Sequence, residues 1–162
     1  MRLNNKKIKS YIWFVYVLIG ILFTLFVITK FFPIRIFNQI PIYVFPIFGF
    51  ILFVVIQYRG KQWFEYDSDG EALNFKNEDV VLSHFISSSK KHSEFPKRKL
   101  HSYQITGNIF KRTLEILLRS KKSNTGYSKL KYDISYLNKT EVKNIRKSLD
   151  KVLEENKTKV FK

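Results

Sequence analysis

The sequence predicts an α+β membrane protein, in which a two-helix transmembrane hairpin precedes an antiparallel β domain that a C-terminal amphipathic helix caps. Two long uncharged apolar runs lie in the first 59 residues, which contain seven Lys or Arg and no Asp or Glu. Beyond residue 60, six or seven short strand-like runs are separated by polar turns, and the last segment has apolar residues at helical spacing. These observations divide the chain into residues 1–59, a basic tail with the hairpin, and residues 60–162, a second domain.

The two membrane spans are expected over about residues 10–31 and 41–58. Ser10 to Thr29 holds 20 residues without a charge, and a helix of that length covers the ~30 Å hydrocarbon core of a bilayer. The second span is expected to begin at Pro41, because proline fits the first turn of a helix. A cleaved signal peptide is the alternative for the first span, but the residues after it lack the small side chains that signal peptidase requires.

Lysine and arginine residues set the expected orientation of the hairpin. Six of them flank the outer ends of the two spans and two lie in the loop between the spans. The positive-inside rule therefore predicts that both termini and the second domain are cytoplasmic, at a plasma or inner membrane. Because the two apolar runs carry no charge, ion paths or chemistry within the bilayer are not expected.

Two further sets of residues in and near the spans are candidates for specific roles. Aromatic rings prefer the headgroup zone, and the candidate interfacial anchors are Tyr11, Trp13, Tyr58 and Trp63. Gly20 and Gly49 lie near the middle of their spans and are candidates for a close helix contact. The alternative is that these two glycines are incidental.

The second domain begins with a hairpin signal, the turn Asp67-Ser68-Asp69-Gly70 between the runs KQWFEYD and EALNFK. A second turn is expected at residues 77–79 and a loop at residues 87–98. Further strands are expected at VVLSHFI, KLHSYQI, TLEILLRS and YSKLKYDIS. A helix is expected over about residues 139–156, because Asn138 and Glu141 have the spacing of a capping box ahead of an apolar stripe.

This order of elements resembles the bacterial PH-like (pleckstrin-homology-like) family, in which a two-helix membrane hairpin precedes such a domain. The matching pieces are the hairpin, WFEYDSDGEALNFKNEDVVL, FPKRKLHSYQI, KRTLEILLRS and LNKTEVKNIRKSLDKVL. The resemblance implies a PH-like β-barrel or sandwich and a cytoplasmic scaffold for protein or lipid contacts. It carries over no phosphoinositide site, because the turn at residues 67–70 is acidic where phosphoinositide-binding PH domains cluster basic residues.

The sequence shows no catalytic constellation. His84, His92 and His101 lack the spacing of paired metal ligands, and no glycine-rich phosphate loop occurs. Asp67 and Asp69 flank a turn, where aspartate is favoured by its hydrogen bonds to the backbone. Cysteine is absent, which excludes disulfides and thiolate metal sites. We therefore expect no enzymatic activity, no cofactor, no metal and no small-molecule substrate.

A basic segment, KKHSEFPKRK at residues 90–99, has five positive charges around a Phe-Pro pair. Residues 61–162 as a whole carry 22 Lys or Arg against 13 Asp or Glu. Each cation near an anionic membrane surface contributes about 1 kcal/mol of attraction. The candidate lipid-surface residues are Lys90, Lys91, Phe95, Lys97, Arg98 and Lys99, with Phe95 available to insert. The alternative is a solvated loop without a fixed contact.

The expected function is that of a non-enzymatic integral membrane protein. It would present a basic PH-like domain at the cytoplasmic face for contacts with a protein partner, with anionic lipid headgroups, or with both, and an accessory subunit of a membrane complex is one form of this role. The alternatives are a membrane-tethered nucleic-acid-binding protein, for which no RRM, KH or helix-turn-helix signature is found, and a subunit of an enzyme or transporter whose sites are shared across chains. Nucleic acid is not an expected partner.

Overall fold

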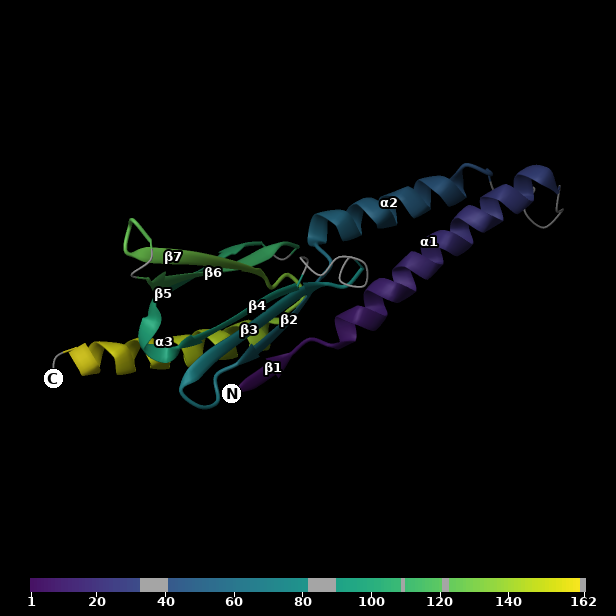
Figure 1. The fold of residues 1–162 in the computed structure, drawn as a ribbon. Coiled ribbons are helices and arrows are strands. Elements are labelled where there is room, and N and C mark those ends of the chain that lie inside the picture. The colour runs from purple at the N-terminus through teal and green to yellow at the C-terminus, as the bar shows by residue number, and fades with distance from the viewer. Residues whose placement is uncertain (33–40, 82–89, 109, 121–122, 161–162) are drawn as a thin grey trace. The chain divides into compact units, whose positions relative to one another are not determined.

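The computed structural model describes residues 1–32, 41–81, 90–108, 110–120 and 123–160. The chain divides into two compact units, whose elements are labelled in Figure 1. The helical unit is Lys7–Lys61, and the strand unit combines Met1–Lys6 with Gln62–Lys162. The helical unit is therefore an insertion within the strand unit, and the first six residues are not a tail of the hairpin as the sequence division at residue 60 predicted.

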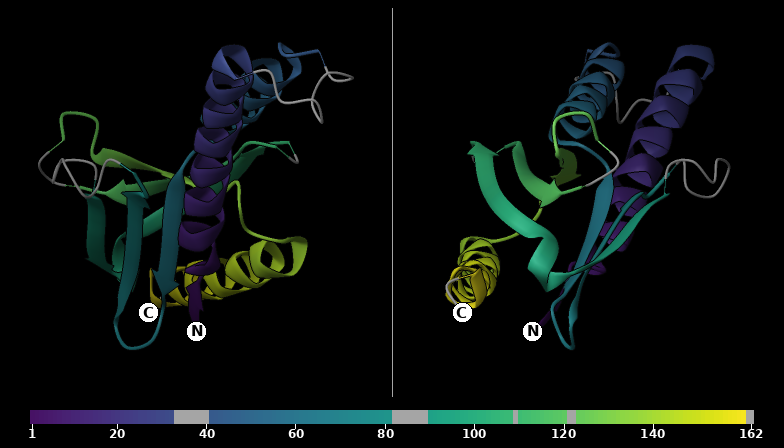
Figure 2. Two further views of the ribbon diagram at one scale, coloured as in Figure 1. Left: turned by 90° about the vertical axis from the view of Figure 1, so that its right-hand side faces the viewer. Right: turned by 60° about the vertical axis from the view of Figure 1, so that its left-hand side comes forward.

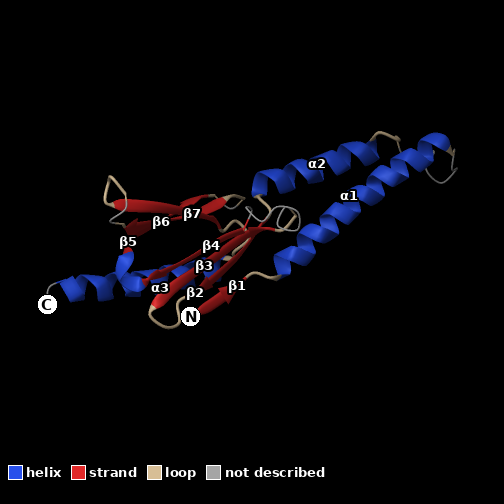
Figure 3. Ribbon diagram, viewed as in Figure 1, coloured by secondary structure: helices blue, strands red, loops and turns tan. Residues whose placement is uncertain are grey.

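The helical unit consists of two helices that lie side by side, α1 (Lys7–Phe31) and α2 (Val44–Arg59), shown in blue in Figure 3. α2 begins three residues later than the second span was expected to begin, because the carbonyl of Pro41 accepts a turn hydrogen bond from the N–H of Val44 (2.9 Å). This start puts Pro46 in the first helical turn. The first turn needs no N–H donor at that position, so the proline removes no helical hydrogen bond.

Apolar side chains cover the outside of the helical unit. α1 has 25 residues, about 37 Å at the helical rise, and it is long and apolar enough to cross a bilayer. Among the helices that the structure describes, it alone meets that standard; α2 is equally apolar but has 16 residues. Large exposed side chains on both helices include Trp13, Phe23 and Phe50. Contiguous apolar surface of this kind marks an interaction surface, membranes included.

The strand unit contains two antiparallel sheets, which Figure 2 shows from two further directions. The first sheet has the order β1 (Arg2–Asn4), β2 (Gln62–Asp67), β3 (Ala72–Asp79) and β4 (Lys90–Pro96). A short 3-10 turn, η4 (Lys97–Lys99), leads to the second sheet, β5 (Leu100–Gly107), β6 (Arg112–Arg119) and β7 (Tyr127–Asp133). The chain continues into α3 (Lys139–Val160). Closure of the two sheets into a PH-like barrel stays a prediction.

β1 is a strand that the sequence did not predict. Leu3 pairs with Tyr66 in the register of β2, and the side-chain oxygen of Asn5 accepts a hydrogen bond from the N–H of Phe64 (2.9 Å). Arg2 forms an ion pair with Glu65 (3.3 Å). The first residues of the chain thus complete the edge of a sheet whose other strands follow the helical insertion.

Two elements between residues 72 and 99 also differ from expectation. β3 runs through Asn77–Asp79, where a turn was expected, because the side chain of Asn77 is buried and donates to the carbonyl of Asp133 (3.0 Å). β4 occupies Lys90–Pro96, where a loop was expected, and pairs with β3 throughout. The strand expected at VVLSHFI lies mostly in residues 82–89, outside the described part of the chain.

The predicted strands β5, β6 and β7 and the predicted C-terminal helix are confirmed. Asn138 and Glu141 form the expected capping box: the side-chain oxygen of Asn138 accepts from the N–H of Glu141 (2.8 Å), and the Glu141 carboxylate accepts from the N–H of Asn138 (2.7 Å). α3 extends to Val160, beyond the expected end near residue 156.

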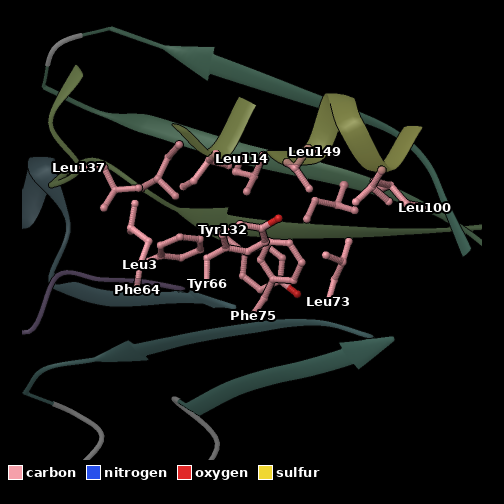
Figure 4. Packing of buried hydrophobic residues seen from close by; sticks show 14 of the residues in the cluster. Leu3, Phe64, Tyr66, Leu73, Phe75, Leu100, Leu114, Tyr132, Leu137 and Leu149 are labelled. Carbon is pink, nitrogen blue, oxygen red and sulfur yellow. The ribbon is translucent and has the colours of Figure 1, made fainter. Parts of the chain in front are cut away.

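The core of the strand unit lies between the two sheets and α3 (Figure 4). Phe75 is at its centre and stacks on Tyr132 and Phe95, with ring centroids 5.0 and 5.6 Å apart. α3 contributes Ile145 and Leu149, both fully buried. Complete burial of each such side chain stabilises a fold by about 1.5–3 kcal/mol, so packing between the sheets and α3 holds the unit together.

Candidate functional site

The strand unit has two distinguishable ends. The chain leaves this unit just after β1, at Lys6, and returns to it at Gln62, where β2 begins. Because β1 and β2 are antiparallel, both connections to the helical unit lie at the same end of the first sheet, which we call the connected end. The turn between β2 and β3 lies at the opposite, far end.

The basic segment runs from one end of the strand unit to the other. β4 starts at Lys90, which pairs with Glu78 near the connected end, and stops at Pro96, which pairs with Ala72 at the far end. Seven strand residues span about 20 Å. The five cations therefore do not form the single loop that the sequence predicted. Lys91 is exposed near the connected end, on an edge strand, where lysine is also a usual guard against edge pairing.

The cations of η4 form a basic corner at the far end, defined as Lys97, Arg98 and Lys99. Its backbone is fixed, because the N–H of Lys97 donates to the carbonyl of Glu71 (3.0 Å) and the amide of Asn156 donates to the carbonyls of Lys97 (2.9 Å) and Leu100 (3.1 Å). Arg98 and Lys99 are exposed. No ion pair between described residues includes any of the three. The N-terminal ammonium group, through its hydrogen bond and its charge, lowers the pKa of the Asp69 carboxyl in the β2–β3 turn, and the charge of nearby Lys97 adds to this effect. Arg98 and Lys99 therefore provide the exposed charge of the corner.

Two of the aromatic residues proposed for membrane contact are buried in the strand unit. Phe95 is 5% exposed and stacks on Phe75, so its ring is part of the core and is not available to insert. Trp63 is 6% exposed, and its indole N–H donates to the side-chain oxygen of Asn4 (3.0 Å). Both assignments are therefore corrected. The exposed rings among the proposed anchors are Tyr11, Trp13 and Tyr58.

The two glycines of the spans do not meet as a pair. Gly49 is buried, and a Cβ there would lie 3.9 Å from Leu22 of α1. Gly20 is exposed and has open space where a Cβ would lie. The contact between the helices therefore uses Gly49, and Gly20 is incidental.

A hairpin tip that the sequence reasoning missed lies between β5 and β6. Phe110 is 60% exposed there, and Lys111 beside it is also exposed. The side-chain oxygen of Asn108 accepts hydrogen bonds from the N–H groups of Phe110 (3.0 Å) and Lys111 (2.9 Å), which hold the backbone at these two residues. Gly107 has a φ of 110°, and a Cβ on it would clash with the carbonyl oxygen of Lys111. Only glycine fits that position.

Hydrogen bonds tie this tip to the connected end. The carbonyl of Arg112 accepts a hydrogen bond from the N–H of Ile134 (2.9 Å). The carbonyl of Asp133, the residue before Ile134, accepts one from the side-chain amide of Asn77 (3.0 Å). Asn77 lies opposite Phe64, near the start of β2. A lone phenylalanine in a short polar turn was the available sequence signal, but neither its exposure nor the end of the sheet on which it lies could be derived from spacing.

The described residues contain no cluster of three metal-ligating side chains. His92 is hydrogen-bonded to Asn74 (2.9 Å), and the ring of His101 packs against that of Tyr127 in a tilted arrangement. His84 lies outside the described residues. The Asp67 carboxylate accepts the N–H of Asp69 (2.9 Å), as expected of turn chemistry. These described polar groups thus have partners within the strand unit.

A hollow of about 300 Å³ lies on the second sheet, lined by Ser102, Tyr103, Gln104, Glu115, Ile116, Leu117 and Lys129. The ammonium groups of Lys129 and Lys131 donate to Glu115 at 2.5 and 2.8 Å, and these hydrogen bonds lower the pKa of its carboxyl. Burial raises the pKa of Tyr103, whose hydroxyl donates to Asp150 (2.6 Å).

Comparison with known proteins adds no family to these observations. No protein-family model, curated protein or solved structure matches the chain.

Proposed function

We propose that this chain is a non-enzymatic integral membrane protein that presents a basic PH-like domain, the strand unit, at the cytoplasmic face, and that it acts there as an accessory subunit of a membrane complex. In this proposal α1 and α2 both cross the bilayer as a hairpin, although α2 is short. The excess of Lys and Arg at the outer ends of the two helices supports the cytoplasmic orientation.

The observation that carries the proposal is the insertion of the helical unit between β1 and β2. The strand unit is consequently joined to apolar helices through two short connections, one at Asn5 and Lys6 and one at Gly60 and Lys61. Two short connections restrict the rotation of a domain far more than one long linker, because each fixes a point on its surface. Such an arrangement keeps the strand unit within a few residues of the apolar helices, as expected of a membrane-anchored scaffold.

The basic corner is the surface proposed for a protein partner with an acidic face. It lies at the far end of the strand unit, about 20 Å from both connections, which is more than two Debye lengths at physiological salt. A position that far from the connections favours a cytosolic protein over headgroups. The exposed side chains of Arg98 and Lys99 on a fixed backbone provide the charge complementarity that steers association.

Purification of the full-length protein from native membranes in mild detergent tests this function. We expect the protein to resist alkaline carbonate extraction and to retain a stoichiometric partner. Combined replacement of Lys97, Arg98 and Lys99 by glutamine should release that partner, whereas the matched replacement of Lys143, Lys147 and Lys151 on the exposed side of α3 should not. Extraction by carbonate, recovery of the bait alone, or equal retention by both triple variants would each contradict the proposal.

A further inference from the structure

The β5–β6 tip has the composition of an element that contacts the interface of a bilayer. Phe110 presents its ring to solvent, and Lys111 follows it with an exposed ammonium group. An exposed aromatic ring next to a lysine matches the two layers of a membrane surface, because the ring favours the headgroup and acyl boundary while the cation favours anionic lipid.

Hydrogen bonds hold the backbone of Phe110 and Lys111, and the ring of Phe110 is exposed. The side-chain oxygen of Asn108 accepts hydrogen bonds from two backbone N–H groups. The positive φ of Gly107 allows the hairpin to turn there. Because the ring of Phe110 is exposed to solvent, packing in the core of the strand unit does not stabilise it. Its exposure therefore points to a partner outside the strand unit.

The position of the tip indicates which partner the ring contacts. The tip lies at the connected end of the strand unit, the end that carries Lys6 and Gln62, through which the chain joins the apolar helices. If α1 crosses the bilayer, as proposed above, three residues of chain separate Lys6 from the expected start of the first span at residue 10, and three separate Gln62 from the expected end of the second span at residue 58. The charge of the tip is positive, and the cytoplasmic leaflet is negative.

We propose that Phe110 and Lys111 form a lipid-contact site, in which the phenyl ring enters the headgroup region of an anionic bilayer and the ammonium group binds lipid phosphate. The site rests on the proposed membrane anchoring and adds a third point of attachment to the two chain connections.

The absence of cysteine from the chain makes a site-specific test possible. Single cysteines are introduced into the full-length protein as Phe110→Cys at the tip, Glu71→Cys at the far end, and Phe23→Cys on the exposed side of α1. Each variant is labelled with the environment-sensitive dye NBD and reconstituted into vesicles of phosphatidylcholine with phosphatidylglycerol. Iodide in the water and nitroxide-labelled lipid in the bilayer are the two quenchers.

We expect the label at position 110 to lose most of its emission to the nitroxide lipid and little to iodide, and the label at position 71 to show the reverse. The nitroxide quenching at position 110 should fall in vesicles of phosphatidylcholine alone and when Lys111→Gln is added. The matched change Lys151→Gln on α3 should leave it unchanged.

Two results would contradict the inference. One leaves the proposed membrane anchoring intact, and the other contradicts the anchoring as well. Iodide quenching at position 110 equal to that at position 71, with the label at position 23 protected, would refute the lipid-contact site and leave the membrane anchoring intact. Iodide quenching at position 23 would refute the anchoring itself and the site with it.

Discussion

Replacement of Leu3 by alanine should destabilise a domain whose other strands begin about sixty residues later in the chain. Leu3 is 8% exposed and packs in the core cluster of the strand unit. Removal of a buried leucine side chain to alanine costs about 2–5 kcal/mol. We expect the lower limit, about 2 kcal/mol, because β1 has three residues at a sheet edge and can relax around the missing side chain.

Hydrogen exchange of the full-length protein in detergent micelles measures this effect. A loss of about 2 kcal/mol raises the equilibrium constant for opening by about 30-fold, so the protected amides of β2 and β3 should exchange faster by that factor. Ile21→Ala, a similar truncation at a half-exposed position of α1, is the control and should leave these amides unchanged. Exchange in Leu3→Ala that matches the control within the ±0.5 kcal/mol of surface substitutions would show that the N-terminal residues are a tail and that the helical unit is not an insertion.

Two further predictions concern the second sheet. Gly107→Ala should lower the free energy of unfolding by about 1–3 kcal/mol, because alanine would clash with the carbonyl of Lys111 and is strained at a φ of 110°. Chemical denaturation measures this loss of stability. An unchanged denaturation midpoint would refute the geometry at Gly107. The stability that Glu115 provides over Glu115→Gln should be fully present above the ordinary glutamate pKa of about 4.3 and should be lost as the pH falls through its lowered folded-state pKa. Denaturation at a series of pH values checks the sign, and an advantage that grows toward acid would contradict the ion pairs with Lys129 and Lys131.

The sequence is informative where a pattern is local. The alternation along β6 and the capping box at Asn138 depend on neighbouring residues, and both elements form where they were predicted. β1 could not be predicted, because Arg2-Leu3-Asn4 has one apolar residue and its partner strand is distant in the chain. β4 was missed because its exposed edge carries charges and its only large inward ring is Phe95.

The candidate sites show the same division between local and distant information. Charge density identified residues 90–99 as unusual, but the direction of β4 decides that Lys91 and Arg98 lie at opposite ends of the strand unit. Composition predicts Phe95 and Trp63 as membrane contacts, because it cannot distinguish a buried ring from an exposed one. The exposure of the Phe110 ring could not be predicted for the same reason.

We propose above that the helical unit crosses the bilayer and leaves the strand unit inside. Labelling of single-cysteine variants with a membrane-impermeant maleimide in sealed cells tests it most directly. Phe32→Cys lies just beyond the end of α1, and Glu71→Cys lies in the turn between β2 and β3. We predict that Phe32→Cys reacts in intact cells and that Glu71→Cys reacts only after the membrane is opened. Reaction of both positions in intact cells, or of neither, would contradict the claim.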